Sequence, residues 1–176
     1  TAKDSTAFRG VRRVRSVRGI DVLETREDVG ADGTGAFAIE LLETISLPPD
    51  FEPTSFPIVY DNAARFRWRM RDFRIRGLDR VAQNYSIFVP AQTPTVAGIA
   101  CARVEFFRND PVGGRPGHYE ADIDPQTGFV LAWRELDGSG QPIVESAYET
   151  FVYGGDVSDM QLGDRLFKAK ELDITG

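Results

Sequence analysis

The chain has 176 residues, one Cys and one His, and it carries a formal net charge of −6. Because a domain usually takes about 100–200 residues, we expect one domain over residues 1–176. The acidic balance argues against a nucleic-acid-binding protein, the 41% hydrophobic share argues against a disordered chain, and no apolar run approaches the roughly 20 residues of a membrane-spanning helix.

The charges are distributed unevenly along the chain. Residues 1–20 hold six basic residues against one acid, a balance of +5, whereas residues 117–176 hold twelve acids against four basic residues, a balance of −8. This split predicts either a basic face and an acidic face, or cancellation by pairing between strands.

Strands are predicted throughout the first quarter of the chain. They are predicted over 7–17, 20–28 and 36–46. In the last of these, Phe37, Ile39 and Leu41 recur at every second position, which is the spacing of a half-buried strand. A hairpin loop is predicted at 30–35, where Gly recurs. The next segment, 47–64, contains four prolines, which excludes a regular strand or a long helix and is typical of a lid or binding loop.

Residues 65–71 alternate Arg with large apolar residues and predict another half-buried antiparallel strand, followed by a bulge or sharp bend near residue 72. Short helical turns are predicted at 78–83 and 156–168. The remaining strands are predicted at 84–90, 99–108, 117–124, 129–136 and 143–153. The turn sequences Asp124–Gly128 and Asp137–Gly140 join three of these strands, so the chain is expected to form a meandering antiparallel sheet.

The sequence offers little support for catalysis or metal binding. No nucleophile can be placed beside His118, and Cys101 lies in an apolar alternating run typical of a small buried hydrophobe. One His and one Cys cannot supply a zinc site, and Asp124, two residues after Asp122, is expected to start a turn rather than bind calcium. We predict no catalytic residue, no metal and no cofactor; an enzyme that uses His118 or the two aspartates is the least favoured alternative.

One face of the 65–71 strand presents a row of arginines: Arg65, Arg67, Arg69 and Arg71. The aromatic residues of this strand are on the other face, which argues against a stacking platform for single-stranded nucleic acid. Two roles remain open for the row. The arginines either pair with acids of neighbouring strands, or dock an acidic protein partner or the anionic headgroups of a membrane surface.

Residues 79–160 carry a resemblance to a known family. The segments that resemble the RseB/MucB N-terminal domain, and more distantly the lipoprotein carriers LolA and LolB, are 84–89, 96–106, 119–131 and 135–145, read in that order. The opening segment 7–12 is similar to the first strand of these proteins. Within 119–131, the turn Asp124-Pro125-Gln126-Thr127-Gly128 matches the pattern "D-p-x-T-G" of the family.

This resemblance implies a mainly β (α+β) fold: a strongly curved antiparallel sheet that forms a half-open β-barrel around a hydrophobic concavity, with a loop or short helix as a lid. It also implies a periplasmic or otherwise exported protein that regulates an anti-sigma factor and has no catalytic residues. The sequence departs from the family in three places. No amphipathic helix precedes 7–17, Gly98 is followed by Ile99 instead of Arg, and 47–78 has little likeness to the corresponding region.

The expected function is therefore binding without catalysis. The concave face is predicted to hold a lipid acyl chain, a lipoprotein or a hydrophobic peptide, in a protein that senses the state of the cell envelope and associates with the membrane surface. The large apolar residues predicted to line this face are Phe66, Trp68, Met70, Phe88, Phe106, Leu131 and Trp133, each with ordinary core packing as the alternative. The second hypothesis is a protein-interaction module that docks an acidic partner through Arg65, Arg67, Arg69 and Arg71.

Overall fold

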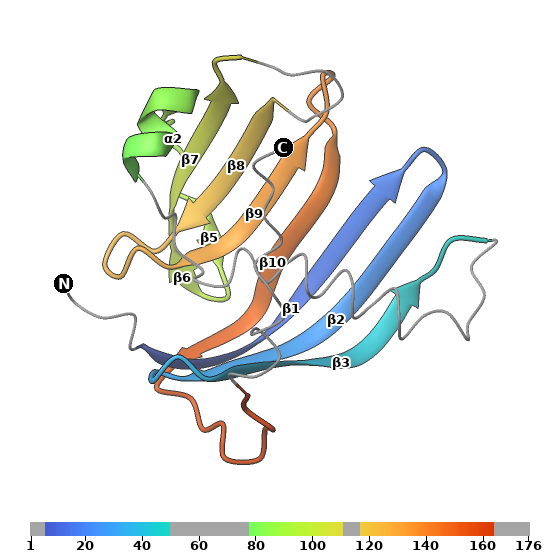
Figure 1. Cartoon of the computed structure of the whole chain (residues 1–176), viewed down its shortest axis with the longest axis vertical. Helices are drawn as coiled ribbons and strands as arrows, with labels where there is room; N and C mark the ends of the chain where they lie inside the picture. The colour runs from blue at the N-terminus through green and yellow to red at the C-terminus, as the bar shows by residue number, and fades with distance from the viewer. Residues whose placement is uncertain (1–5, 50–77, 111–116, 164–176) are drawn as a thin grey trace.

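The computed structural model describes residues 6–49, 78–110 and 117–163. Eight strands form one antiparallel sheet in the order β3-β2-β1-β10-β9-β8-β7-β4, and β5 and β6 form a separate hairpin (Figure 1). The elements in chain order are β1 (Ala7–Arg18), β2 (Asp21–Asp32), β3 (Phe37–Ser46), α2 (Leu78–Asn84), β4 (Tyr85–Phe88), β5 (Thr95–Val96), β6 (Ile99–Ala100), β7 (Ala102–Arg108), β8 (His118–Ile123), β9 (Val130–Leu136) and β10 (Pro142–Tyr153).

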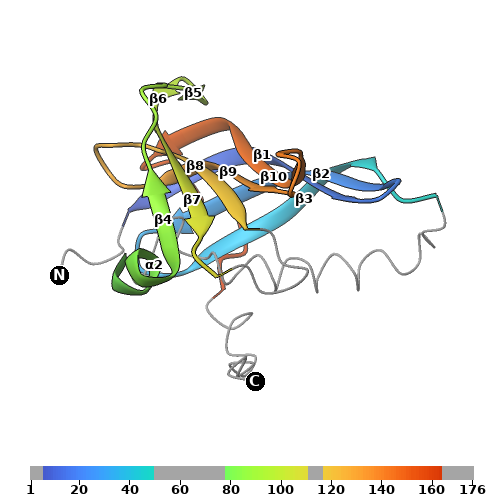
Figure 2. The same cartoon turned by 90° about the horizontal axis from the view of Figure 1, so that it is seen from above.

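The sheet is curved and open, as predicted. Its edge strands are β3 and β4, which do not pair with each other, and seen from above the sheet bends between β10 and the group β4, β7 and β8 (Figure 2). The predicted helical turn at 78–83 is α2, whereas no helix lies in the described part of 156–168. No helix in the described ranges is long and apolar enough to cross a bilayer. Residues 50–64 of the predicted lid region 47–64, the predicted strand 65–71 and the bend near 72 lie outside the described residues.

Two predicted elements need correction. The single strand predicted at 99–108 is interrupted at Cys101, because Ile99 and Ala100 pair back with β5 in a separate hairpin whereas β7 pairs with β8 from Ala102 onward. The strand predicted at 20–28 continues to Asp32, since its partner β1 pairs with it over the whole length from Ala7 to Arg18. The loop predicted at 30–35 is correspondingly shorter.

Five aromatic rings pack together at the centre of the core. Phe8 of β1 lies 4.8 Å from Phe129 and 5.4 Å from Phe151, measured between ring centroids. Tyr148 and Tyr153 of β10 each make an edge-to-face contact with Phe151, at 5.0 and 4.9 Å. Such aromatic pairs stabilise the fold beyond their burial alone. These five core rings therefore join β1, the first strand in the chain, to β10, the last.

Gly10 lies in β1, in the middle of this packing. A Cβ atom at this position would lie 2.5 Å from the Thr150 carbonyl oxygen and 2.8 Å from the Tyr148 ring. We expect Gly10→Ala to lower the free energy of unfolding by about 1–3 kcal/mol, because the added methyl group overpacks the core. Urea denaturation measures this change. Gly138→Ala is the control, since a Cβ there meets no atom within 4 Å. Equal urea midpoints for the two variants would contradict the close packing around Gly10.

Candidate binding face

Strand register divides the side chains of the sheet into two faces. Trp133 of β9 is directly opposite Ala121 of β8 and Ser146 of β10. Residues directly opposite each other in an antiparallel pair point to the same side of the sheet. Following these pairs outward, Val104 of β7 and Val14 of β1 belong to the same side as Trp133. We call this side the inner face and the opposite side the outer face.

The inner face carries four aromatic rings that contact one another, from the four consecutive strands β4, β7, β8 and β9. The Trp133 ring lies 5.4 Å from Tyr119 and 6.2 Å from Phe106, and Tyr85 lies 5.9 Å from Tyr119 and 6.5 Å from Phe106. We call these four residues the aromatic cluster. Because side chains alternate between the faces, each strand needs only one or two inward residues to build such a surface.

The structure brings together two of the seven predicted lining residues, Phe106 and Trp133. Leu131 is only 1% exposed and belongs to the hydrophobic core. Phe88 pairs with Glu105, so it lies on the outer face, and it is 57% exposed. Phe88 therefore does not share a face with Phe106, contrary to the expectation. Phe66, Trp68 and Met70 lie outside the described residues, as do Arg65, Arg67, Arg69 and Arg71.

Sequence reasoning missed two members of the aromatic cluster, Tyr85 and Tyr119. Tyr119 belongs to an alternation with Ala121 and Ile123 in the predicted strand 117–124, and this alternation is a signal that the sequence offers. Tyr85 is the first residue of β4, directly after α2, where alternation cannot be read.

A buried ion pair lies on the inner face beyond β10. The Arg12 guanidinium of β1 contacts Glu27 Oε2 of β2 at 2.8 Å, and the two residues are 7% and 1% exposed. The Thr25 hydroxyl donates to the other carboxylate oxygen of Glu27 at 3.3 Å. Burial also raises the pKa of the neighbouring Tyr148 hydroxyl. The inner face is thus aromatic over β4 to β9 and contains a buried charge pair over β1 and β2.

The outer face carries ion pairs between neighbouring strands. Asp122 of β8 accepts hydrogen bonds from Arg103 of β7 at 2.8 and 3.0 Å and from Arg134 of β9 at 3.2 Å. Further pairs join β1 to β10 through Arg15 and Glu145, at 3.6 Å. The uneven charge of the sequence is therefore cancelled in part by pairing across strands, as at Arg15, Arg103 and Arg134.

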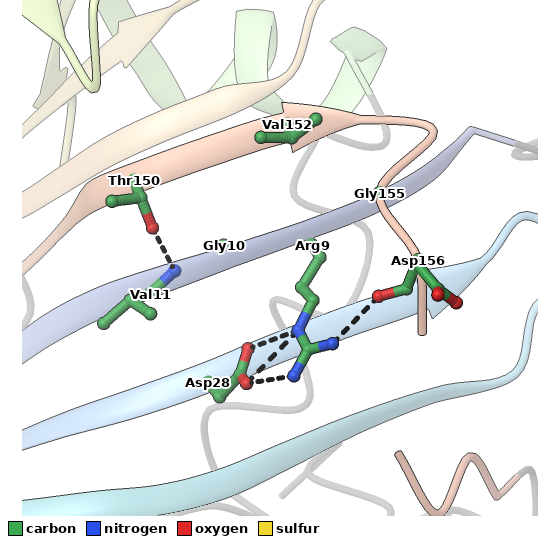
Figure 3. Close-up of a pocket in the computed structure, with 8 residues that line it drawn as sticks. All are labelled: Arg9, Gly10, Val11, Asp28, Thr150, Val152, Gly155 and Asp156. Atoms are coloured by element: carbon green, nitrogen blue, oxygen red, sulfur yellow. Dashed lines mark hydrogen bonds and ion pairs between the residues drawn. The ribbon is translucent and has the colours of Figure 1, made fainter. Parts of the chain in front are cut away.

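A shallow cavity of about 330 Å³ lies on the outer face between β1, β10 and the segment after β10 (Figure 3). Arg9 is its central charged group. The Arg9 guanidinium contacts Asp28 at 2.8 Å and Asp159 at 2.6 Å, and it donates to the Asp156 carbonyl oxygen at 2.9 Å. These bonds hold the segment after β10 against the sheet. The positive charge beside Asp28 and Asp159 is thus supplied by Arg9.

Asp124 starts a turn, as predicted. Its carboxylate accepts hydrogen bonds from the Gln126 amide at 2.9 Å, the Thr127 hydroxyl at 2.8 Å and the Tyr153 hydroxyl at 2.6 Å. Burial opposes ionisation, but these hydrogen bonds outweigh it and lower the pKa of Asp124. No group of three or more metal-ligating side chains occurs in the described ranges.

The two remaining reactive side chains, His118 and Cys101, both pack against neighbouring residues. His118 lies on the outer face, stacked on Phe107 at 4.2 Å and 3.6 Å from a Glu105 carboxylate oxygen. Cys101 is buried, which raises the pKa of its thiol, and the thiol donates to the Ile99 carbonyl oxygen. The prediction that Cys101 is a small buried residue is confirmed.

Comparisons with solved structures support the predicted fold. A crystal structure of MucB aligns with a TM-score of 0.59 over 93% of this chain and 59% of that chain, at 15% identity. MucB in the Pseudomonas aeruginosa MucA/MucB complex aligns with a TM-score of 0.52 over 91% of this chain and 57% of that chain, also at 15% identity. An outer membrane lipoprotein-sorting domain from Vibrio parahaemolyticus has 8% identity over 90% of both chains, with a TM-score of 0.33 that is too low to carry an argument.

No family model matches the sequence, and no curated protein matches it. This chain spans less than two thirds of the MucB chain to which it is similar. At 15% identity the likeness concerns the fold, and on that level the resemblance expected from residues 79–160 is confirmed.

Proposed function

We propose that this chain is an exported, non-enzymatic binding domain whose inner sheet face holds an acyl chain, a lipoprotein or a hydrophobic peptide. The observation that carries the proposal is the aromatic cluster, four contacting rings gathered from four strands on one face. Aromatic and apolar surfaces with a few polar groups are the usual lining of sites for apolar ligands. The likeness of the fold to MucB supports a binding role and is compatible with export.

The proposal is tested by binding of a fluorescent fatty-acid probe to the purified protein. We expect Trp133→Ala to weaken the affinity about tenfold, since it removes a large part of the apolar contact area. The matched control is Val152→Ala, which truncates an exposed apolar side chain on the outer face. If the wild-type protein binds no probe and releases no lipid on organic extraction, the carrier function is wrong.

A second candidate function is docking of a protein partner through Arg65, Arg67, Arg69 and Arg71. It is supported by the solved complex of MucB, a protein of similar fold, with MucA. Binding through these arginines should weaken steeply between low and high salt, whereas binding to the aromatic cluster should not. Replacement of the four arginines by Gln should remove that salt dependence; an unchanged dependence would argue against this function.

A further inference from the structure

Glu135 occupies an unusual position beside the aromatic cluster. It lies two residues after Trp133 in β9, directly opposite Tyr119 of β8 and Val144 of β10, and so on the inner face. By the same register, it is the only acidic residue that the described strands β4, β7, β8 and β9 place on this face. A carboxylate thus lies in the same surface as the four rings.

The environment of Glu135 differs from that of the acids on the outer face. Glu120, Asp122 and Glu145 each lie within 4 Å of an arginine, whereas Glu135 forms no ion pair with any described residue. Burial raises the pKa of Glu135, and the neighbouring Trp133 indole opposes this only in part. The carboxylate is therefore partly desolvated, and no cation of residues 6–49, 78–110 or 117–163 compensates it.

Other charged groups around Glu135 do not supply that cation. His118 and Arg134 belong to the outer face, and Glu145 does as well. Arg108 of β7 is on the inner face, but β8 lies between β7 and β9, and Arg108 is not among the groups that shift the pKa of Glu135. A positive charge carried by a ligand would compensate the desolvated carboxylate.

We propose that Glu135 and the aromatic cluster bind the ammonium group of an amphiphile, a ligand in which a positively charged amine is joined to an apolar chain. The faces of tryptophan and tyrosine rings attract ammonium groups, most strongly where water is excluded. The carboxylate neutralises the charge, and Phe106 and Tyr85 contact the apolar chain. This inference rests on the proposed function and specifies the class of its ligand.

The experiment compares three detergents with the same twelve-carbon chain: dodecyltrimethylammonium, neutral dodecyl maltoside and dodecyl sulfate. Their affinities for the folded protein are measured by titration calorimetry below the micellar concentration of each. We expect the ammonium compound to bind about tenfold more tightly than the neutral one, and the sulfate to bind most weakly. Glu135→Gln should abolish the preference for ammonium and leave the affinity for dodecyl maltoside unchanged.

The control is Glu43→Gln, which makes the same chemical change at an exposed position of β3. It should retain the preference. If the neutral detergent binds and the ammonium compound binds no more tightly, or if Glu135→Gln keeps the preference, the inference is overturned while the proposed function stands. If none of the three detergents binds while the fatty-acid probe does, the inference alone is overturned; if the probe does not bind either and no lipid is released on extraction, the proposed function fails as well.

Discussion

Replacing Glu27 with alanine is expected to lower the free energy of unfolding by about 3–5 kcal/mol, because the substitution leaves the Arg12 guanidinium buried without its carboxylate. Arg12 is 7% exposed, and both its Nε and a terminal nitrogen lie 2.8 Å from Glu27 Oε2. An effect of this size is a large part of the total stability of a domain. Urea denaturation followed by circular dichroism measures it.

The double variant Arg12→Met/Glu27→Leu separates the burial of charge from the loss of packing. Removing both charges and keeping apolar volume is expected to recover most of the lost stability. A control is Glu149→Ala, which removes a carboxylate from a partly exposed pair with Arg26 on the outer face. That change should cost about 1 kcal/mol or less. Equal losses for Glu27→Ala and Glu149→Ala would contradict the buried position of the Arg12–Glu27 pair.

Leu131→Ala is the second substitution with a large expected effect, about 2–5 kcal/mol in the free energy of unfolding. Leu131 is 1% exposed in the core, so its truncation leaves a cavity that the surrounding strands fill only in part. The same variant decides between the two roles considered for Leu131. As a core residue it should change stability and leave the affinity of the folded protein for the fatty-acid probe unchanged.

Phe106→Ala is the comparison for Leu131→Ala. Phe106 is also buried, but it is a member of the aromatic cluster, so its truncation should reduce both stability and probe affinity. If Leu131→Ala weakened probe binding as strongly as Phe106→Ala at a temperature where both variants are folded, Leu131 would line the ligand site after all.

The local part of the fold could be predicted from the sequence. The hairpins that join β8, β9 and β10 depend on short turns whose residues determine the backbone conformation, such as Asp124 with its hydrogen bonds to the next residues. The strand order could not be predicted, because β1 pairs with β10 across almost the whole chain and alternation contains no information about partners.

The candidate site shows the same limit. Alternation divides the side chains of each strand between two faces. Only the register between strands shows which residues of neighbouring strands share a face. Without that register, Phe88 is wrongly predicted on the same face as Phe106. Leu131 was grouped with Trp133 because both are at odd positions. The β8–β9 register shifts between Asp122 and Ile123, which pair with Ala132 and Val130. Leu131 lies between these two partners, so simple alternation does not connect it with Trp133.

The pairing of β1 with β10 has a consequence for the rate and order of folding. The Arg9–Asp159 bond closes a loop of 150 residues, and no strand of the described sheet other than β10 links β1 to β9. Contacts between residues so distant in the chain slow folding, since the entropy of closing the loop is lost before the contacts form. The β1–β2–β3 meander must therefore wait, with one edge of β1 unpaired, until residues up to Tyr153 have been synthesised.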